Sequence, residues 1–281
     1  MYQYIQVQTT ESELMACNEL LRKVFPKSKT YNDAYIGWEY AHNPEGEIVG
    51  FNAWSGKEIV AHYVAQPLMA SINGVEHKGL LSLNTATHPN HQGKKLFINL
   101  AEKTYEQAAS MGYEFVIGVA NANSTHGFIN KLGFQLIGPL DAKLGIGKIQ
   151  YKEKQIANSF VRLWNKKSMG WRLSNPNTSY EIIQQTIFAP SEKLGIKVVM
   201  GTFNEQITGL SQDISTSISI NPIKLYLGLD PNIDWKNSRF YDIPNRFRPS
   251  PLNLIFKDLT GNGLKLDLKT LLFRAIDFDA Y

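Results

Sequence analysis

The residues in this chain with the clearest potential for chemistry form a short loop between an apolar segment and a helical one. Residues 80–87 are expected to form a strand, and residues 96–111 a helix that Gly112 ends. The loop between them contains Gln92, Gly93, Lys94 and Lys95. Backbone N–H groups at a helix N-terminus have no partner within the helix and lie at the positive end of its dipole, so they attract anions. The loop therefore predicts a phosphate-binding site.

Three histidines near this loop are candidate general bases, because an imidazole with its ordinary pKa near 6.5 exchanges protons at neutral pH. They are His62 on an expected strand, His88 at the end of the apolar strand, and His126 near the start of a later helix. Each could equally be a hydrogen-bonded structural residue. Glu39, between two aromatic residues, is most simply a solvated carboxylate. A base is not obligatory either, since a water chain can accept the proton of an amine with a modest pKa.

The loop and its surroundings resemble the GCN5-related N-acetyltransferases (GNAT). Their pyrophosphate loop usually reads Arg or Gln, any, any, Gly, any, Gly or Ala, and residues 92–97 (QGKKLF) occupy these positions. Lys95 and Phe97 stand where the family usually has small residues. A second strand at 115–120 and a helix ending in Leu132-Gly133-Phe134 complete the family's order. The resemblance covers about residues 1–150 and implies an α+β GNAT fold with a mixed, mostly antiparallel sheet.

The resemblance also implies a cofactor, acetyl-CoA, and residues to bind it. Its phosphates would lie on the backbone of residues 92–97, which include Leu96 and Phe97. The thioester would lie near Ala86, Thr87, Asn123, Ser124 and Phe128. In the family a backbone N–H of the first strand polarises the thioester carbonyl. Many relatives carry a carboxylate on that strand where this chain has Asn84, and a tyrosine where it has Ile129. Asn84 is kept as a catalytic candidate with His62 and His126.

The composition limits the classes of function. With 281 residues, of which 43% are hydrophobic and 19% charged, the chain is long enough for one large or two ordinary domains. A net charge of +4 is too small to indicate nucleic-acid binding. The single Cys17 excludes an internal disulfide and suits a reducing compartment. We find no signal-peptide pattern and no apolar run approaching the roughly 18 residues of a membrane span. We therefore expect a soluble cytoplasmic protein.

The composition changes after about Gly138, and we expect a GNAT domain over residues 1–148 and a degenerate GNAT-like domain over 149–281. Gly170-Trp171 followed by Asn175-Pro176 repeats Gly37-Trp38 followed by Asn43-Pro44 about one domain length later, which favours tandem related domains. The second copy has no glycine-rich loop, so one cofactor site is expected. Strands are expected over 180–189, 193–203 and 206–220, with 252–259 and 271–278 completing the second sheet.

The acceptor is expected to be a small molecule bound between the two domains. Trp38 and Tyr63 are candidate contacts from the first domain. The segment 235–248 is rich in side chains that bind phosphate or stack on bases, namely Trp235, Arg239, Tyr241, Arg246 and Arg248. A solvated loop is the alternative. By resemblance to tandem acetyltransferases of bacterial surface-glycan pathways, we expect the acceptor to be a nucleotide-linked amino sugar.

Two classes of function remain open at this stage. The first is an N-acetyltransferase in which a primary amine attacks acetyl-CoA directly, with a nucleotide-linked amino sugar, another small amine or a protein lysine as acceptor. The second is a non-catalytic acetyl-CoA-binding protein, which the absent carboxylate and tyrosine favour. Release of CoA in the presence of candidate amines distinguishes the two classes. No metal is expected, and the oligomeric state stays open.

Overall fold

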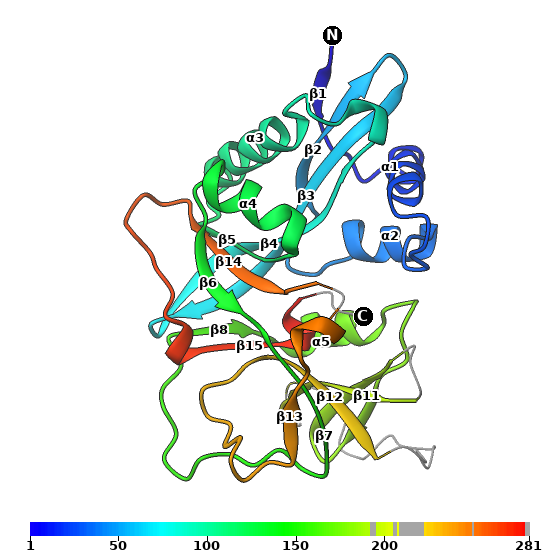
Figure 1. Ribbon diagram of the computed structural model, residues 1–281. Helices are drawn as coiled ribbons and strands as arrows, with labels where there is room; N and C mark the ends of the chain where they lie inside the picture. The colour runs from blue at the N-terminus through cyan, green and yellow to red at the C-terminus, as the bar shows by residue number, and fades with distance from the viewer. Residues whose placement is uncertain (192–194, 205–206, 208–221, 249, 279–281) are drawn as a thin grey trace.

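The computed structural model describes residues 1–191, 195–204, 207, 222–248 and 250–278. Four of its α-helices lie in the first half of the chain, and the fifth lies in the second half (Figure 1). They are α1 (Glu11–Val24), α2 (Asp33–Ala41), α3 (Leu96–Ser110), α4 (Ala122–Asn130) and α5 (Lys166–Leu173). None of the described helices is long and apolar enough to cross a membrane.

The described strands join into a single 15-stranded sheet. They are β1 (Gln3–Gln6), β2 (Val49–Ser55), β3 (Glu58–Ile72), β4 (Val75–Thr87), β5 (Phe115–Ala120), β6 (Gln135–Pro139), β7 (Asp141–Ile146), β8 (Phe160–Leu163), β9 (Glu181–Ile183), β10 (Thr186–Pro190), β11 (Lys197–Thr202), β12 (Ile223–Leu229), β13 (Phe240–Asp242), β14 (Asn253–Asp258) and β15 (Leu271–Arg274). Only three of the recorded pairs are parallel, β4–β5, β11–β12 and β8–β15. The expected mixed, mostly antiparallel sheet is therefore confirmed.

Helices cover both faces of the first half of the sheet, because successive strand residues face opposite sides. On β3, Tyr63 packs with α3 residues such as Leu100, whereas its neighbour Val64 packs with α1 and α2 residues such as Leu21. All of these side chains are buried. Figure 1 shows α3 and α4 on one side of β2–β5 and α1 and α2 on the other. The two cores hold the strands that form the site.

The two halves of the chain, on either side of residue 148, exchange strands. β14, from the second half, lies between β5 and β6, and β7, from the first half, lies between β12 and β13. The strand expected over 252–259 therefore forms, but it completes the first half of the sheet and not the second. Each half thus holds one strand of the other between two of its own strands, which leaves neither inserted strand as an unpaired edge.

The pairing pattern of the first half recurs in the second. β2–β3–β4 are antiparallel neighbours followed by the parallel pair β4–β5, and β9–β10–β11 are antiparallel neighbours followed by the parallel pair β11–β12. β8 and β14 pair with strands that precede residue 148, so the hydrogen-bonded sheet continues across the expected boundary. The division at 148 stays a prediction about folding units. The strand expected over 206–220 lies outside the described residues, apart from Ile207.

Candidate active site

The loop before α3 has the backbone shape expected of an anion receptor. Gly93 has φ +73° and Lys95, the residue that precedes the helix, has φ +59°, both in the left-handed region. The N-terminus of α3 has no side-chain cap, so its first N–H groups are open to a ligand. Gln92, Lys94 and Lys95 are exposed around it. A small residue without a Cβ suits both left-handed positions, and Lys95 occupies one of them at some conformational cost.

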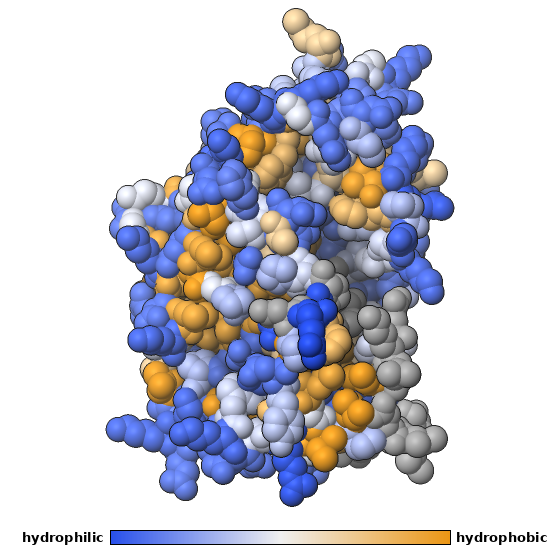
Figure 2. Space-filling view, in the orientation of Figure 1, coloured by the Kyte–Doolittle hydropathy of each residue, from blue (hydrophilic) through white to orange (hydrophobic). Residues whose placement is uncertain are grey.

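A cavity opens where β4 and β5 separate. Their parallel pairing spans Gly79 to Leu81 on β4 and Phe115 to Ile117 on β5, and it ends there although both strands continue. The cavity of about 630 Å³ is lined by residues of both separated strands, by the start of α4 and by the connection from α1 to α2. In Figure 2 the surface is hollowed between α4 and α2. A slender ligand could therefore pass from the α3 loop between the strands.

An irregularity in β4 directs polar groups into this cavity. Ala86 pairs with His62 of β3, and Leu83 pairs with Val64. Between these pairs β4 has two residues, Asn84 and Thr85, where β3 has one, so β4 forms a bulge. Asn84 has φ +32°, a backbone conformation that asparagine tolerates better than most residues. Both bulged residues line the cavity. Strained backbone next to a cavity is typical of functional sites.

A chain of hydrogen bonds leads from the cavity wall to a buried carboxylate. Tyr31 and Tyr35 line the cavity together with Asn84. The Tyr31 hydroxyl donates to Asn84 Oδ1 over 3.3 Å, and Asn84 Nδ2 donates to Glu39 Oε2 over 2.6 Å. The Tyr35 hydroxyl donates to Glu39 Oε1 over 2.9 Å. Both oxygens of Glu39 are thus connected to groups that a ligand would contact.

Glu39 is not solvated, contrary to the sequence-based expectation. Asn32 caps α2 by accepting from Tyr35 N, and the helix places Glu39 on its inner face with 1% exposure. Burial raises the pKa of Glu39 to about 7, although the hydrogen bond from Asn84 and the charge of Arg172 oppose the shift. A carboxyl group that titrates near neutral pH is suited to general-base catalysis.

The structure places His62 in the core and not on the cavity. Its Nδ1 lies 2.7 Å from Asn52 Oδ1 and its Nε2 lies 2.8 Å from the Tyr40 hydroxyl, and its exposure is 0%. Burial lowers the pKa of His62 to about 3, so the ring is neutral over the physiological range. These contacts do not favour His62 as the base, because both ring nitrogens are already bonded to other core residues.

The other histidine candidates also lie off the cavity wall. His88 Nδ1 accepts from Asn90 N at the turn before the α3 loop, a local capping contact. His126 is exposed on α4, and neither ring is among the residues that line the cavity. Asn84 is the catalytic candidate that the structure brings to the cavity.

The expected cofactor residues divide into two groups. Asn123, Ser124 and Phe128 line the cavity from α4, and the Phe128 ring packs edge-on against Phe97, with ring centroids 5.1 Å apart. Ala86 is buried with 2% exposure, and neither it nor Thr87 lines the cavity. The β4 backbone that borders the cavity runs from Leu81 to Thr85, so the bulge moves the candidate N–H donors to an earlier part of the strand.

The expected acceptor residues lie outside this cavity as well. Trp38 is stacked on Trp171, and Tyr63 is buried with its hydroxyl 2.9 Å from Ser82 Oγ, which does line the cavity. Tyr241 is 75% exposed on β13, Arg239 and Arg246 are exposed, and Arg248 Nε donates to Ile243 O. The role of these residues in acceptor binding stays a prediction.

Sequence reasoning missed the residues that α1 and α2 supply. Tyr31, Tyr35 and Glu39 are far from the strand and loop in sequence, and no motif includes them. The usable signal was Asn32 as the cap of a nine-residue helix that is apolar except for Asp33 in its first turn and Glu39, so that Glu39 lies among apolar residues and is partly buried. Within the described part of the chain, no cluster of His, Cys, Asp or Glu could hold a metal ion.

Comparison with known proteins identifies the first part of the chain. Residues 7–137 match the family model described as the acetyltransferase (GNAT) domain. The chain contains a GNAT domain. The match covers just under half of the 281 residues, so it identifies the domain and not the whole chain. No curated protein sequence matches the chain.

Solved structures show the same fold over nearly the whole chain. A probable N-acyltransferase from Enterococcus faecalis V583, a protein of unknown function, has a TM-score of 0.64 at 8% identity, with 92% of this chain and 73% of that chain covered. A GCN5-related N-acetyltransferase from Anabaena variabilis has a TM-score of 0.60 at 8% identity and the same coverage. One from Kribbella flavida has 0.57 at 12%, covering 91% and 71%. The likeness includes the second half, which the GNAT family model does not reach.

The residues present fit acetyl-CoA. The uncapped start of α3 beside Lys94 and Lys95 offers N–H donors and positive charge to phosphates. The gap between β4 and β5 offers a passage lined by apolar side chains such as Leu83 and Val119, which suits a flexible linker. In the GNAT domain the reactive end would then lie near Asn84 and Tyr35.

Proposed function

We propose that the protein transfers the acetyl group of acetyl-CoA to a primary amine that binds in the cavity between α2 and α4. The observation that carries the proposal is the buried Glu39, whose two oxygens bond to two residues of the cavity wall, Tyr35 and Asn84. An idle cofactor-binding protein would not need a carboxyl group with a pKa of about 7 behind its binding site. This argument favours the enzyme over the non-catalytic alternative.

Glu39 is proposed to accept the amine proton through Tyr35. The bound cofactor supplies the activated acyl group. The Tyr35 hydroxyl, which donates to Glu39 Oε1 over 2.9 Å, can take a proton from the amine while passing its own proton to the carboxylate. Asn84 holds Glu39 Oε2 in place over 2.6 Å and has no proton to exchange at neutral pH. The amine loses one proton, Glu39 gains one, and the Tyr35 hydroxyl is unchanged.

Backbone donors of the β4 bulge are proposed to polarise the carbonyl. Residues 82–85 border the cavity, and the bulge interrupts the pairing with β3 at Asn84 and Thr85. N–H groups freed in this way can donate to an oxygen on which negative charge develops, an effect worth roughly 3–4 kcal/mol for one well-placed donor. Positioning of the amine by the cavity wall adds to this effect.

The direct test is CoA release from acetyl-CoA in the presence of amines, measured with a thiol reagent. The set includes nucleotide-linked amino sugars, an aminoglycoside and a lysine peptide. At least one amine is expected to accelerate release, and Tyr35→Phe is expected to lower turnover while leaving CoA affinity unchanged. Tight binding of acetyl-CoA with no acceleration by any amine supports the non-catalytic alternative.

For the acceptor, we propose a nucleotide-linked amino sugar as the finer assignment. The segment that follows Arg248 reaches the start of α4: Ala122 N donates to Ser250 Oγ over 3.0 Å, and Asn253 Nδ2 donates to Thr125 Oγ1 over 3.0 Å. The expected nucleotide residues are thus connected to the side of the cavity at which α4 begins. A soluble cytoplasmic location is part of the proposal and agrees with the buried free thiol of Cys17.

Melting temperature tests the acceptor assignment. UDP, dTDP and GDP are each added with CoA present, because a ligand that binds only the folded protein raises its apparent stability. At least one nucleotide is expected to raise the melting temperature. Arg246→Gln should remove that increase, whereas Lys236→Gln, a change at another exposed cation in the same segment, should retain it. If only an aminoglycoside or a peptide raises the melting temperature, the nucleotide assignment is wrong.

A further inference from the structure

A second cavity lies in the other half of the protein, at the position that corresponds to the first. β11 pairs in parallel with β12 over Lys197 to Val199, and the cavity is lined by the residues that follow this pairing on both strands. The first cavity has the same relation to β4 and β5. The second cavity has a volume of about 290 Å³, so it is less than half as large as the first.

β15 accounts for the smaller size. It pairs with β12 at Gly228 and Leu229, just past the end of the β11–β12 pairing, and thus fills the gap that stays open between β4 and β5. Arg274, at the end of β15, lines the cavity that remains. A long ligand such as CoA cannot pass through a gap closed by a paired strand. The second cavity is therefore suited only to a compact ligand, since its volume lies at the lower end of the roughly 300–1,000 Å³ range of ligand pockets.

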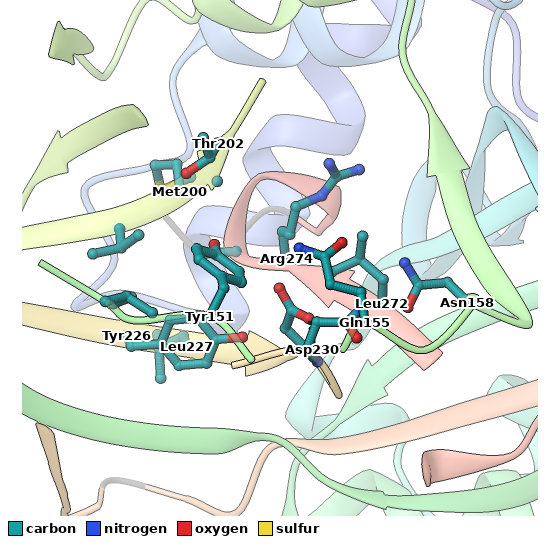
Figure 3. Close-up of a pocket in the computed structure, with 15 residues that line it drawn as sticks. Tyr151, Gln155, Asn158, Met200, Thr202, Tyr226, Leu227, Asp230, Leu272 and Arg274 are labelled. Carbon is teal, nitrogen blue, oxygen red and sulfur yellow. Dashed lines mark hydrogen bonds between the residues drawn. The ribbon is translucent and has the colours of Figure 1, made fainter. Parts of the chain in front are cut away.

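Polar groups without partners face this cavity. Figure 3 shows Tyr226, Asp230, Gln155 and Asn158 grouped around it. Tyr226 is 5% exposed, and neither its hydroxyl nor Oδ1 of Asn158 has a hydrogen-bond partner among the described residues. A buried hydroxyl that makes no hydrogen bond destabilises the folded protein. Retaining one on a cavity wall indicates a ligand that pairs with it.

The charges of the cavity determine the chemistry of that ligand. Asp230 contributes a carboxylate, and burial raises the pKa of this group. The one guanidinium in the lining belongs to Arg274, which is bonded to both oxygens of the buried Asp277 and lies 4.3 Å over the Phe203 ring. Its charge is therefore already matched. The atoms left for a ligand are mainly oxygen acceptors, which disfavour phosphates and favour a ligand with several O–H or N–H donors.

We propose that this second cavity binds a small polyhydroxylated ligand of the size of one monosaccharide, neutral or carrying an amino group, through Tyr226, Asp230 and Asn158. Vicinal hydroxyl groups can donate to Oδ2 of Asp230 and to the remaining lone pair of its Oδ1, which already accepts from Asn232 N, and a further hydroxyl can pair with the Tyr226 hydroxyl. The site is separate from the acetyl-transfer site, and the proposal does not depend on the identity of the amine acceptor. The second half is thus a binding module derived from the same strand pattern.

Saturation-transfer NMR and calorimetry on the full chain test the proposal with D-glucose, D-galactose and D-glucosamine as probes and inorganic phosphate as the anionic control. A sugar is expected to bind saturably with CoA present at saturating concentration, and phosphate is not. Tyr226→Phe and Asp230→Asn should each weaken the sugar about tenfold, as expected for the loss of one hydrogen bond to a buried group. Tyr31→Phe, the matched change in the first cavity, should leave sugar affinity unchanged.

Two binding results would overturn the proposal. The first is the absence of saturable binding by all three sugars, and the second is sugar binding that Tyr31→Phe weakens and Tyr226→Phe does not. A further readout does not depend on the choice of sugar. Tyr226→Phe should keep or raise the melting temperature of the ligand-free protein, because it removes an unpaired buried hydroxyl. A clear decrease in that melting temperature would show that the hydroxyl has a structural partner and would also count against the site.

Discussion

Trp38 and Trp171 form a reciprocal pair at the junction of the two halves. Their rings are stacked with centroids 4.7 Å apart and planes within 15°. Trp38 Nε1 donates to Trp171 O over 3.0 Å, and Trp171 Nε1 donates to Trp38 O over 3.1 Å, across 133 residues of sequence. Each tryptophan ring thus donates a hydrogen bond to the backbone carbonyl of the other tryptophan. This reciprocity is the geometry of a local twofold relation between α2 and α5.

This pair is expected to contribute to stability as a unit. Trp171→Phe keeps most of the buried ring but leaves Trp38 O without its donor, so the free energy of unfolding should fall by about 1–3 kcal/mol. The double variant Trp38→Phe/Trp171→Phe should lose less than the sum of the two single variants, because the two bonds share one stack. Urea denaturation of the four proteins measures this coupling. Additive losses would show that the two bonds act independently.

The α3 loop provides a prediction about cofactor affinity. Gly93→Val places a β-branched residue at φ +73°, where only glycine is free of strain, so CoA should bind much more weakly. Lys95→Gly is the matched control: it relieves a left-handed backbone at φ +59° and restores the small residue of the GNAT pattern, so affinity should be equal or tighter. Calorimetric titration with CoA measures both. Normal affinity in Gly93→Val would remove the loop from the cofactor site.

Glu39 predicts a pH dependence of turnover. The carboxylate must be ionised to accept a proton, so turnover at saturating substrates should rise with pH through about 7, the pKa of Glu39. Glu39→Gln keeps the shape of the side chain and should lower turnover by about 10²–10⁴-fold. It should also remove the rise. A pH profile that is unchanged in Glu39→Gln would exclude Glu39 as the proton acceptor.

The same residue predicts a pH dependence of stability. The folded state holds the Glu39 proton up to about pH 7, whereas the unfolded state releases it near 4.5. The folded protein therefore binds more protons between these values, and this contribution to stability decreases as the pH rises from 4.5 to 7. Glu39→Gln should gain stability relative to the native protein over this window, by on the order of 3 kcal/mol at most. Denaturation curves at pH 4.5 and 8 make the comparison.

His62 is expected to affect stability far more than proton transfer. Its folded-state pKa of about 3 lies below its ordinary value of 6.5, so the unfolded state binds the proton first. Stability from this residue is complete above pH 6.5 and is lost as the pH falls, at up to about 1.4 kcal/mol per pH unit. His62→Gln should weaken this acid sensitivity and leave the pH profile of turnover unchanged, measured with acid denaturation and steady-state kinetics. A profile that loses its limb in the histidine range would restore His62 as the base.

The sequence by itself determined the local parts of this protein. The strand at 80–87, the glycine-containing turn at 92–95, and the helix that follows are consecutive, and their residue types fix their backbone shapes without help from distant residues. The resemblance to the GNAT enzymes, which implied the fold and the cofactor, rests on that order. The paired Gly-Trp segments lie on α2 and α5, and the tandem domains that they predict stay a prediction. A local spacing does not always form the contact that it favours: Thr10 and Glu13 have the spacing of a capping box, but the Thr10 side chain makes no cap hydrogen bond and Glu13 accepts from Asn52.

Tertiary structure alone decided which side chains lie behind the cavity. Asn84 on β4 reaches Glu39 because a bulge turns it toward α2. A bulge depends on how two strands pair and cannot be predicted from the residues of one strand. Burial by α2 and α5 changes Glu39 from a solvated carboxylate to a group with a pKa near 7, whereas burial among Asn52 and Tyr40 makes His62 unavailable to a ligand. The strand exchange of β7 and β14 could not be predicted either, since the residues of a strand do not specify which distant strand it pairs with. Burial and pairing partners are properties of the whole packed chain. For that reason the phosphate-binding loop can be predicted from the sequence, whereas the proposed base, Glu39, is found only in the structure.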